Sequence, residues 1–148
     1  MVEFYMSLPA EDIAQQVANL LNDHNKLYKN HTVHSIIRDP GKYFLEIVGN
    51  RVIGCSAILQ EEPKLTRQYH LCVHPDFRRQ GIAKRLKQTS LNNVRTPYVY
   101  VTIREDNIPS LKLNYSFGFI FVKKEWSKDH NVITLGRATI VLQNELPR

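Results

Sequence analysis

One stretch of the sequence, residues 71–86 (LCVHPDFRRQGIAKRL), combines residue types that can bind a phosphate group. Apolar residues run up to His74 and stop at Pro75, which has no N–H for a strand ladder. A basic loop and Gly81 follow, and from Ile82 the apolar residues recur with helical spacing. The pattern predicts a strand, a tight loop and a helix, whose free N–H groups and positive end favour an anion. Gly81 lets the anion approach closely.

The expected helix from Ile82 has an apolar face and a basic face, at about 100° per residue. The apolar face, which we expect to pack on the sheet, carries Ile82, Ala83, Leu86, Ser90, Asn93 and Val94. The other face, which we expect to be solvated, carries Lys84, Arg85, Lys87, Gln88 and Asn92. A solvated basic turn is the simpler interpretation of the stretch, and a phosphate site is the more specific one.

Length and composition predict one globular domain over residues 1–148. Apolar residues make up 43% and charged residues 23% of the chain. No apolar run approaches the ~20 residues of a membrane span, and no signal-peptide pattern opens the sequence. Cys55 and Cys72 lie in apolar runs, which predicts buried, reduced thiols. Together these features favour a cytoplasmic protein with no membrane partner.

Strand and helix signals alternate along the whole chain in the order β-α-α-β-β-β-α-β-α-β-β. The expected helices cover residues 9–24, about 31–38, 82–94 and 107–117. The expected strands cover residues 2–6, 43–48, 51–59, 67–73, 98–103, 119–125 and 132–142, with a loop at 61–63 and a turn at 128–131.

Two segments resemble known signatures of one family. Val73-x-Pro75-x-x-Arg78-x-x-Gly81-x-Ala83 resembles the acyl-CoA-binding signature of the GNAT N-acetyltransferase superfamily, and Asn107-x-x-Ser110 followed by Gly118-Phe119 resembles its second conserved segment. The resemblance implies the α/β GNAT fold, a central mixed, mostly antiparallel twisted sheet of about seven strands flanked by about four helices. It also implies acetyl-CoA as the acyl donor and a primary amine as the acceptor.

The same resemblance implies where acetyl-CoA binds. Backbone amides of the loop would wrap the pyrophosphate, and a backbone N–H near Leu71 to Val73 would face the acetyl carbonyl. The expected cofactor-binding residues are Leu71, Cys72, Val73, Arg78, Arg79, Gln80, Gly81, Ile82, Ala83, Lys84, Asn107, Ser110 and Asn114. We expect no metal, because His31 and His34 have no further ligand at a matching spacing.

The proton-transfer groups depart from the family pattern. Many members carry a tyrosine four residues before the Gly-Phe glycine, where this chain has Asn114 and the tyrosine is the next residue, Tyr115. Either Tyr115 protonates the leaving thiolate through a shifted helix, or no tyrosine acts. The strand before the loop has no carboxylate, so His70 is the candidate base. Tyr69 and Tyr100 are further candidates, and attack by an already neutral amine also fits.

The net charge of +6, from 20 Lys and Arg against 14 Asp and Glu, has two explanations. CoA is a polyanion, but a basic surface with Trp126 among lysines also suits nucleic acid. The main expectation is therefore an N-acetyltransferase acting on a small molecule or peptide. The alternatives are a GNAT-like protein acting on nucleic acid or aminoacyl-tRNA, and a non-catalytic CoA-binding protein. A homodimer is also compatible with the resemblance.

Overall fold

The protein is built on one mixed sheet. A computed structural model describes residues 8–25 and 30–139, and within them six strands form a sheet in the order β1-β2-β3-β4-β6-β5. All neighbouring strands are antiparallel except β3 and β4. The strands are β1 (Lys42–Val48), β2 (Arg51–Glu62), β3 (Leu65–Val73), β4 (Tyr98–Arg104), β5 (Ile120–Ser127) and β6 (His130–Ala138).

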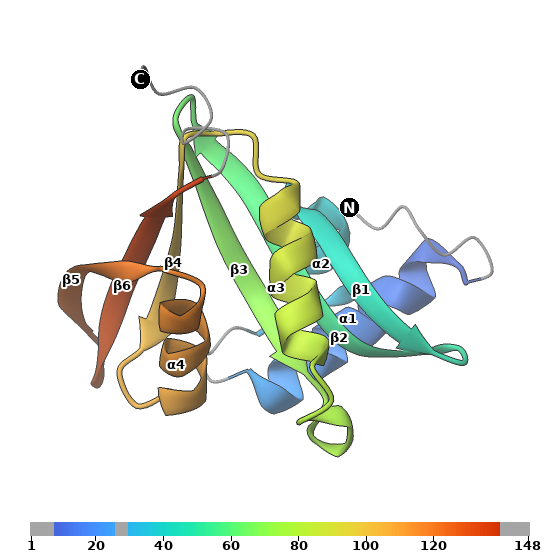
Figure 1. Ribbon diagram of the computed structural model, residues 1–148. Helices are drawn as coiled ribbons and strands as arrows, with labels where there is room; N and C mark the ends of the chain where they lie inside the picture. The colour runs from blue at the N-terminus through green and yellow to red at the C-terminus, as the bar shows by residue number, and fades with distance from the viewer. Residues whose placement is uncertain (1–7, 26–29, 140–148) are drawn as a thin grey trace.

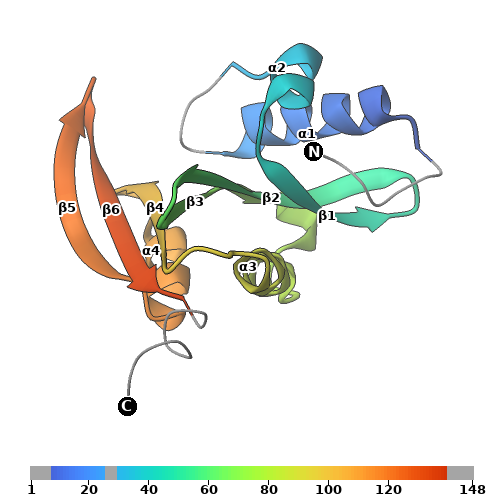
Figure 2. The ribbon, with the colours of Figure 1, turned by 90° about the horizontal axis from the view of Figure 1, so that it is seen from above.

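Helices cover both faces of the sheet (Figures 1 and 2). The α-helices are α1 (Ala10–His24), α2 (Val33–Arg38), α3 (Ile82–Asn92) and α4 (Ile108–Ser116), and a short 3-10 turn, η1 (Pro75–Phe77), follows β3. Figure 2 shows α1 and α2 on one side of the sheet and α3 and α4 on the other. No helix in the described residues is long and apolar enough to cross a membrane.

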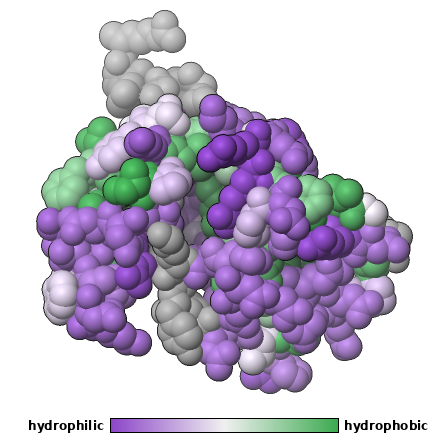
Figure 3. Space-filling model, turned by 90° about the horizontal axis from the view of Figure 1, so that it is seen from below, coloured by the Kyte–Doolittle hydropathy of each residue, from purple (hydrophilic) through white to green (hydrophobic). Residues whose placement is uncertain are grey.

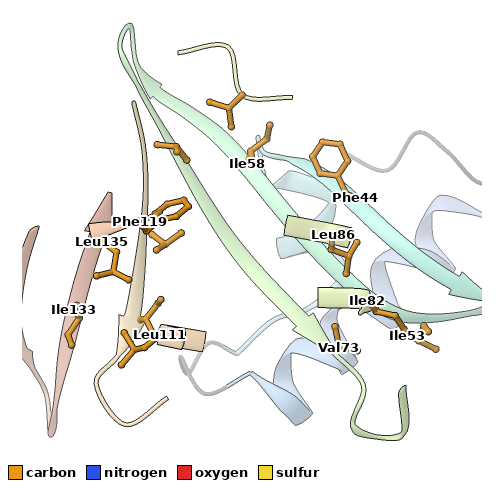
Figure 4. Packing of buried hydrophobic residues seen from close by; sticks show 14 residues of the cluster. Phe44, Ile53, Ile58, Val73, Ile82, Leu86, Leu111, Phe119, Ile133 and Leu135 are labelled. Carbon is orange, nitrogen blue, oxygen red and sulfur yellow. The ribbon is translucent and has the colours of Figure 1, made fainter. Parts of the chain in front are cut away.

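Each layer of helices has its own apolar core. One cluster lies on the face of α3 and α4 (Figure 4). In it Ile82 and Leu86 of α3 lie toward Ile53, and Leu111 of α4 lies toward Leu135. On the opposite face, the apolar stripe of α1 packs on strand residues of β1 to β3 that include both cysteines. Both thiols are buried and free, which confirms their prediction as small apolar core residues.

Strands β3 and β4 are paired over only a short distance. Their parallel ladder joins Leu65, Thr66 and Arg67 to residues 98–100, and no ladder pair in the described chain joins the rest of β3 to β4. In the part of β3 that has no ladder to β4, a bulge places His70 and Leu71 opposite the single residue Ser56 of β2. His70 has a φ of +57°, which a non-glycine residue seldom adopts. The backbone of the bulged half of β3 therefore forms no ladder with β4 in the described chain.

Within the described residues the elements follow the predicted order, and four details are corrected. The strand expected at residues 2–6 and the end of the last one, at 140–142, lie outside the described residues, so these two predictions stay untested. The loop expected at 61–63 is wrong, because β2 extends to Glu62, which pairs with Leu65. The turn expected at 128–131 is shorter, because β6 already begins at His130. The second helix begins at Val33, where the Thr32 side chain caps it.

The fourth correction concerns Lys87, which we expected on the solvated face of α3. Its side chain is 1% exposed and belongs to the inner face of the helix. By the helical repeat, Lys87 lies only about 20° from Val94 around the axis, so it borders the apolar face.

Candidate active site

A cleft opens where β3 and β4 separate. It is lined by residues 68–71 of β3, residues 101–104 of β4, three polar residues of α4, Lys87 of α3 and Asn25 after α1. The cleft is narrow, with a cavity volume of about 60 Å³, and it is partly open to solvent. Figure 3 views this end of the molecule, where the surface on either side of the recess is largely hydrophilic.

The basic loop lies at the N-terminus of α3, where the strand leads into the helix. Arg79 and Gly81 have φ values of +64° and +78°, and a Cβ built on Gly81 would meet nothing closer than 4.0 Å. Alternating left-handed residues of this kind turn successive N–H groups toward one side of the loop. Arg78, Arg79 and Lys84 are exposed around it, while the Arg78 Nε donates to the Val73 carbonyl at 3.1 Å. The loop therefore has the shape and charge of an anion site.

On the α1 and α2 side of the cleft, His70 belongs to a hydrogen-bonded chain of three residues. The Tyr43 hydroxyl lies 2.7 Å from Asp39 Oδ2 and 2.8 Å from His70 Nδ1. We call Asp39, Tyr43 and His70 the Asp39 relay. The Asp39 carboxylate also accepts from the Tyr69 hydroxyl and, at 2.8 Å, from the N–H of Gly41. This carboxylate at the end of α2 is thus fixed by three donors.

The relay sets the tautomer of His70. A hydroxyl has one proton, and a carboxylate only accepts, so Tyr43 donates to Asp39 and accepts from the Nδ1–H of His70. The neutral imidazole then carries its lone pair on Nε2. Burial raises the pKa of Tyr43 far above its ordinary value, and Asp39 raises it further. Burial also raises the pKa of Asp39, but hydrogen bonds from Tyr69, Gly41 and Tyr43 lower it more, so the carboxylate stays ionised. The relay therefore suits a histidine that accepts a proton at Nε2.

On the α3 and α4 side, the cleft is lined by Lys87. Its Nζ donates to Gln68 Oε1 and lies 4.2 Å from the centre of the Phe119 ring. Burial lowers the pKa of Lys87 to about 7, and the positive charge of Arg137 contributes. The cleft thus brings together His70 and a buried lysine whose pKa is about 7.

Helix α4 presents Asn114, not Tyr115, to the cleft. Asn114 is 2% exposed, its Nδ2 donates to the Ser110 carbonyl at 2.9 Å, and its Oδ1 is buried with no hydrogen-bond partner among the residues that the structure describes. Tyr115 is 49% exposed and does not line the cleft. The structure therefore does not bring Tyr115 together with the other predicted site residues.

The remaining predicted residues fall into two groups. Asn107 and Ser110 line the cleft, and the Asn107 side chain also caps α4, where it accepts from the Ser110 N–H at 3.4 Å. Leu71 lines the cleft, whereas the side chains of Cys72 and Val73 are buried in the two cores, so any role of theirs in binding is one of the backbone. Gln80 lies in the loop, and Ile82 and Ala83 begin α3, with Ile82 packed in the core.

Three functional candidates were not found from the sequence. Asp39 was interpreted only as the end of a helix, Tyr43 only as a strand residue and Lys87 as solvated. For Lys87 the signal was its position beside Val94 on the helical wheel. Asp39 and Tyr43 gave no local signal, because the register of β1, β2 and β3 brings them to His70.

The comparisons with known proteins agree with this architecture. The model of the acetyltransferase (GNAT) family matches residues 10–119, so the chain belongs to the GNAT acetyltransferase family. No match was found among curated proteins.

Solved structures with the same fold are distant in sequence. Ard1 from Thermoplasma volcanium has a TM-score of 0.77 at 20% identity, over 89% of this chain and 94% of that one. The ribosomal-protein-S18-alanine N-acetyltransferase of Escherichia coli has a TM-score of 0.73 at 13% identity, over 90% of this chain and 91% of that one. A GNAT family acetyltransferase from Elizabethkingia anophelis with acetyl-CoA bound has a TM-score of 0.66 at 17% identity, over 81% of this chain and 88% of that one. At these identities the likeness shows the fold alone.

Proposed function

We propose that the protein transfers the acetyl group of acetyl-CoA to a primary amine of a small molecule or peptide. The observation that carries this proposal is the Asp39 relay, because it fixes His70 as a proton acceptor inside the cleft where β3 and β4 separate. A protein that only bound CoA would have no use for such a base. The free, buried thiols of Cys55 and Cys72 support a reducing, cytoplasmic setting.

The residues present fit acetyl-CoA. The loop at Gly81 has room for a phosphate and exposed arginines beside it. The orphaned Oδ1 of Asn114 is a buried acceptor beside the cleft, and the pantetheine arm carries amide N–H groups that could satisfy it. When bound, acetyl-CoA supplies an activated acyl thioester.

The chain's own residues then have separate tasks. The half of β3 that has no ladder to β4 in the described chain offers backbone groups to hold the acyl donor beside the acceptor. His70 Nε2 takes the proton that the attacking amine loses, and Nδ1–H stays bonded to Tyr43. The ionised Asp39 stabilises the imidazolium through the Tyr43 hydroxyl. We assign no role to Tyr115.

The nucleic-acid alternative has less support from the C-terminal hairpin. Trp126 is 68% exposed, but two nearby lysines are paired with carboxylates, Lys123 with Glu125 at 2.9 Å and Lys124 with Glu105 at 2.8 Å. Their charge is therefore partly neutralised. Tight tRNA or DNA binding that persists at raised salt would favour this alternative over the proposed function.

The proposal is tested by CoA release from acetyl-CoA with a panel of amines. We expect amine-dependent release that falls by about 10²–10⁴ in His70→Gln, with the affinity for acetyl-CoA retained. His34→Gln, which changes an exposed histidine of α2, is the matched control and should keep full activity. Binding of acetyl-CoA without transfer to any amine would favour a non-catalytic CoA-binding protein.

A further inference from the structure

Lys87 is a buried lysine with no acidic partner in the described part of the chain. None of the ion pairs among the described residues includes it. Its hydrogen bond goes to the neutral amide of Gln68, and its ammonium lies against the faces of Phe119 and Phe117. A lysine held only for stability would be expected to reach solvent or a carboxylate, because burying an unpaired charge is costly.

The groups that face Lys87 from the surrounding elements are neutral or positive. Arg137 of β6 lies near enough to affect its charge, and Arg104 of β4 and His70 of β3 line the same cleft. Helix α4 contributes the uncharged Asn114 to this wall. Burial therefore acts on Lys87 without compensation and lowers its pKa to about 7. A group that titrates near the working pH is well matched to giving up and regaining a proton.

We propose that Lys87 is the general acid that protonates the leaving sulfur of CoA. This inference rests on the proposed function, since it concerns the same transfer. As the C–S bond breaks, its electron pair stays on sulfur, and the Lys87 ammonium gives that sulfur a proton. The attacking amine forms the new C–N bond and loses its proton to His70 Nε2. Lys87 then regains a proton from solvent and His70 releases one, so the cycle balances.

The other cleft residues are poorly suited to this step. The Tyr69 hydroxyl is bonded to Asp39, and burial together with that contact raises its pKa far above neutrality. Arg104 keeps its proton at any relevant pH, and the amide of Asn114 has none to give. Tyr115, at the exposed surface of α4, does not line the cleft. Lys87 is thus the titratable group left on the α3 and α4 side.

The inference is tested by comparing the binding of CoA and desulfo-CoA, which differ only in the thiol. If Lys87 contacts the sulfur, the wild-type protein should bind CoA about two- to tenfold more tightly than desulfo-CoA above neutral pH, because the thiol then shares its proton with the neutral amine. Lys87→Met should remove this preference and leave the affinity for desulfo-CoA unchanged. Lys112→Met, on the exposed side of α4, is the matched control and should keep the preference.

The outcomes separate the two proposals. If the wild-type protein binds neither ligand, the proposed function fails and this inference with it. If it binds both equally, or if Lys87→Met keeps the preference for CoA, only the acid role is overturned. Acetylation of Lys87 found by intact mass after turnover would also overturn it, because the lysine would then be a nucleophile.

Two further measurements keep the inference testable if Lys87→Met does not fold. In the wild-type protein, the ultraviolet absorbance of the thiolate should show that bound CoA ionises at a higher pH than free CoA, whose thiol resembles that of cysteine, because the bound thiol shares its proton with the neutral amine of Lys87. In Lys87→Arg the charge remains but cannot be given up, so turnover should fall while the preference for CoA persists. An unshifted ionisation, or full turnover in Lys87→Arg, would contradict the acid role.

Discussion

The buried amine of Lys87 should make the stability of the protein rise with pH in an unusual range. Its pKa falls from 10.5 to about 7 on folding, and each pKa unit is worth about 1.4 kcal/mol, so the full linkage is about 5 kcal/mol. Between these two values the unfolded chain binds more protons than the folded one, so the free energy of unfolding increases with pH. From about pH 7 to about pH 10 the gain from Lys87 alone is about 3 kcal/mol.

As the pH rises through this range, the more stable protein should change from Lys87→Met to the wild-type protein. The substitution removes the linkage but leaves Gln68 Oε1 without its donor, which costs about 1–3 kcal/mol. We therefore expect Lys87→Met to be more stable than the wild-type protein by about 1–3 kcal/mol at about pH 7. At about pH 10 the linkage that remains is only about 1 kcal/mol, which is no larger than the cost of the lost hydrogen bond, so the variant should be less stable than the wild-type protein by up to about 2 kcal/mol.

Urea unfolding followed by circular dichroism at constant ionic strength measures this directly. Other groups also titrate in this range, so the informative quantity is the difference between the wild-type protein and Lys87→Met at each pH. For Lys112→Met, which changes an exposed lysine, the free energy of unfolding should depend on pH as it does for the wild-type protein. If the free energy of unfolding of Lys87→Met also follows that of the wild-type protein at every pH, the amine keeps its ordinary pKa in the folded protein and the reasoning from burial is refuted.

Three more predictions concern binding and turnover. Acetyl-CoA should raise the melting temperature, and Gly81→Glu should abolish that shift because its carboxylate fills and repels the phosphate position; Gly49→Glu, also at a positive φ with open space around it, should keep the shift. Tyr115→Phe should keep turnover within about twofold, since the side chain is exposed, and a larger fall in kcat would return the acid role to Tyr115. Tyr43→Phe should lower kcat by about 10–100-fold with little change in KM, because His70 loses the acceptor that fixes its tautomer; an unchanged kcat would remove the relay from the mechanism.

The parts of the site that the sequence predicted are those set by neighbouring residues. Pro75 ends a strand, Gly81 leaves open space before a helix, and a further helix begins after Asn107. Each of these roles follows from a backbone preference that acts over a few residues. The same holds for the order of the elements and for the fold class that the family model supports.

The parts that the sequence did not predict depend on contacts between distant segments. Tyr43 pairs with Ala57 on β2, and Ala57 pairs with Tyr69 on β3, so the sheet register brings Tyr43 to the neighbour of His70. The bulge at His70 is a mismatch between two strands and has no signature in either strand alone. The sequence pattern assigned Lys87 to the polar face because lysine is a charged residue. In the structure, Phe119, which lies much later in the chain, covers that side of α3.

The arrangement of the two titratable groups suggests a direction for proton movement. His70 faces the layer of α1 and α2 through Tyr43 and Asp39, and Lys87 lies in the layer of α3 and α4 against Phe119. The sheet separates these layers except where β3 and β4 part, which is the cleft itself. A base on one side and an acid on the other therefore meet only at the cleft. The acceptor amine would lose its proton toward the α1 and α2 side, and the leaving thiol would gain one from the α3 side, so neither group has to exchange its proton with the other during the transfer.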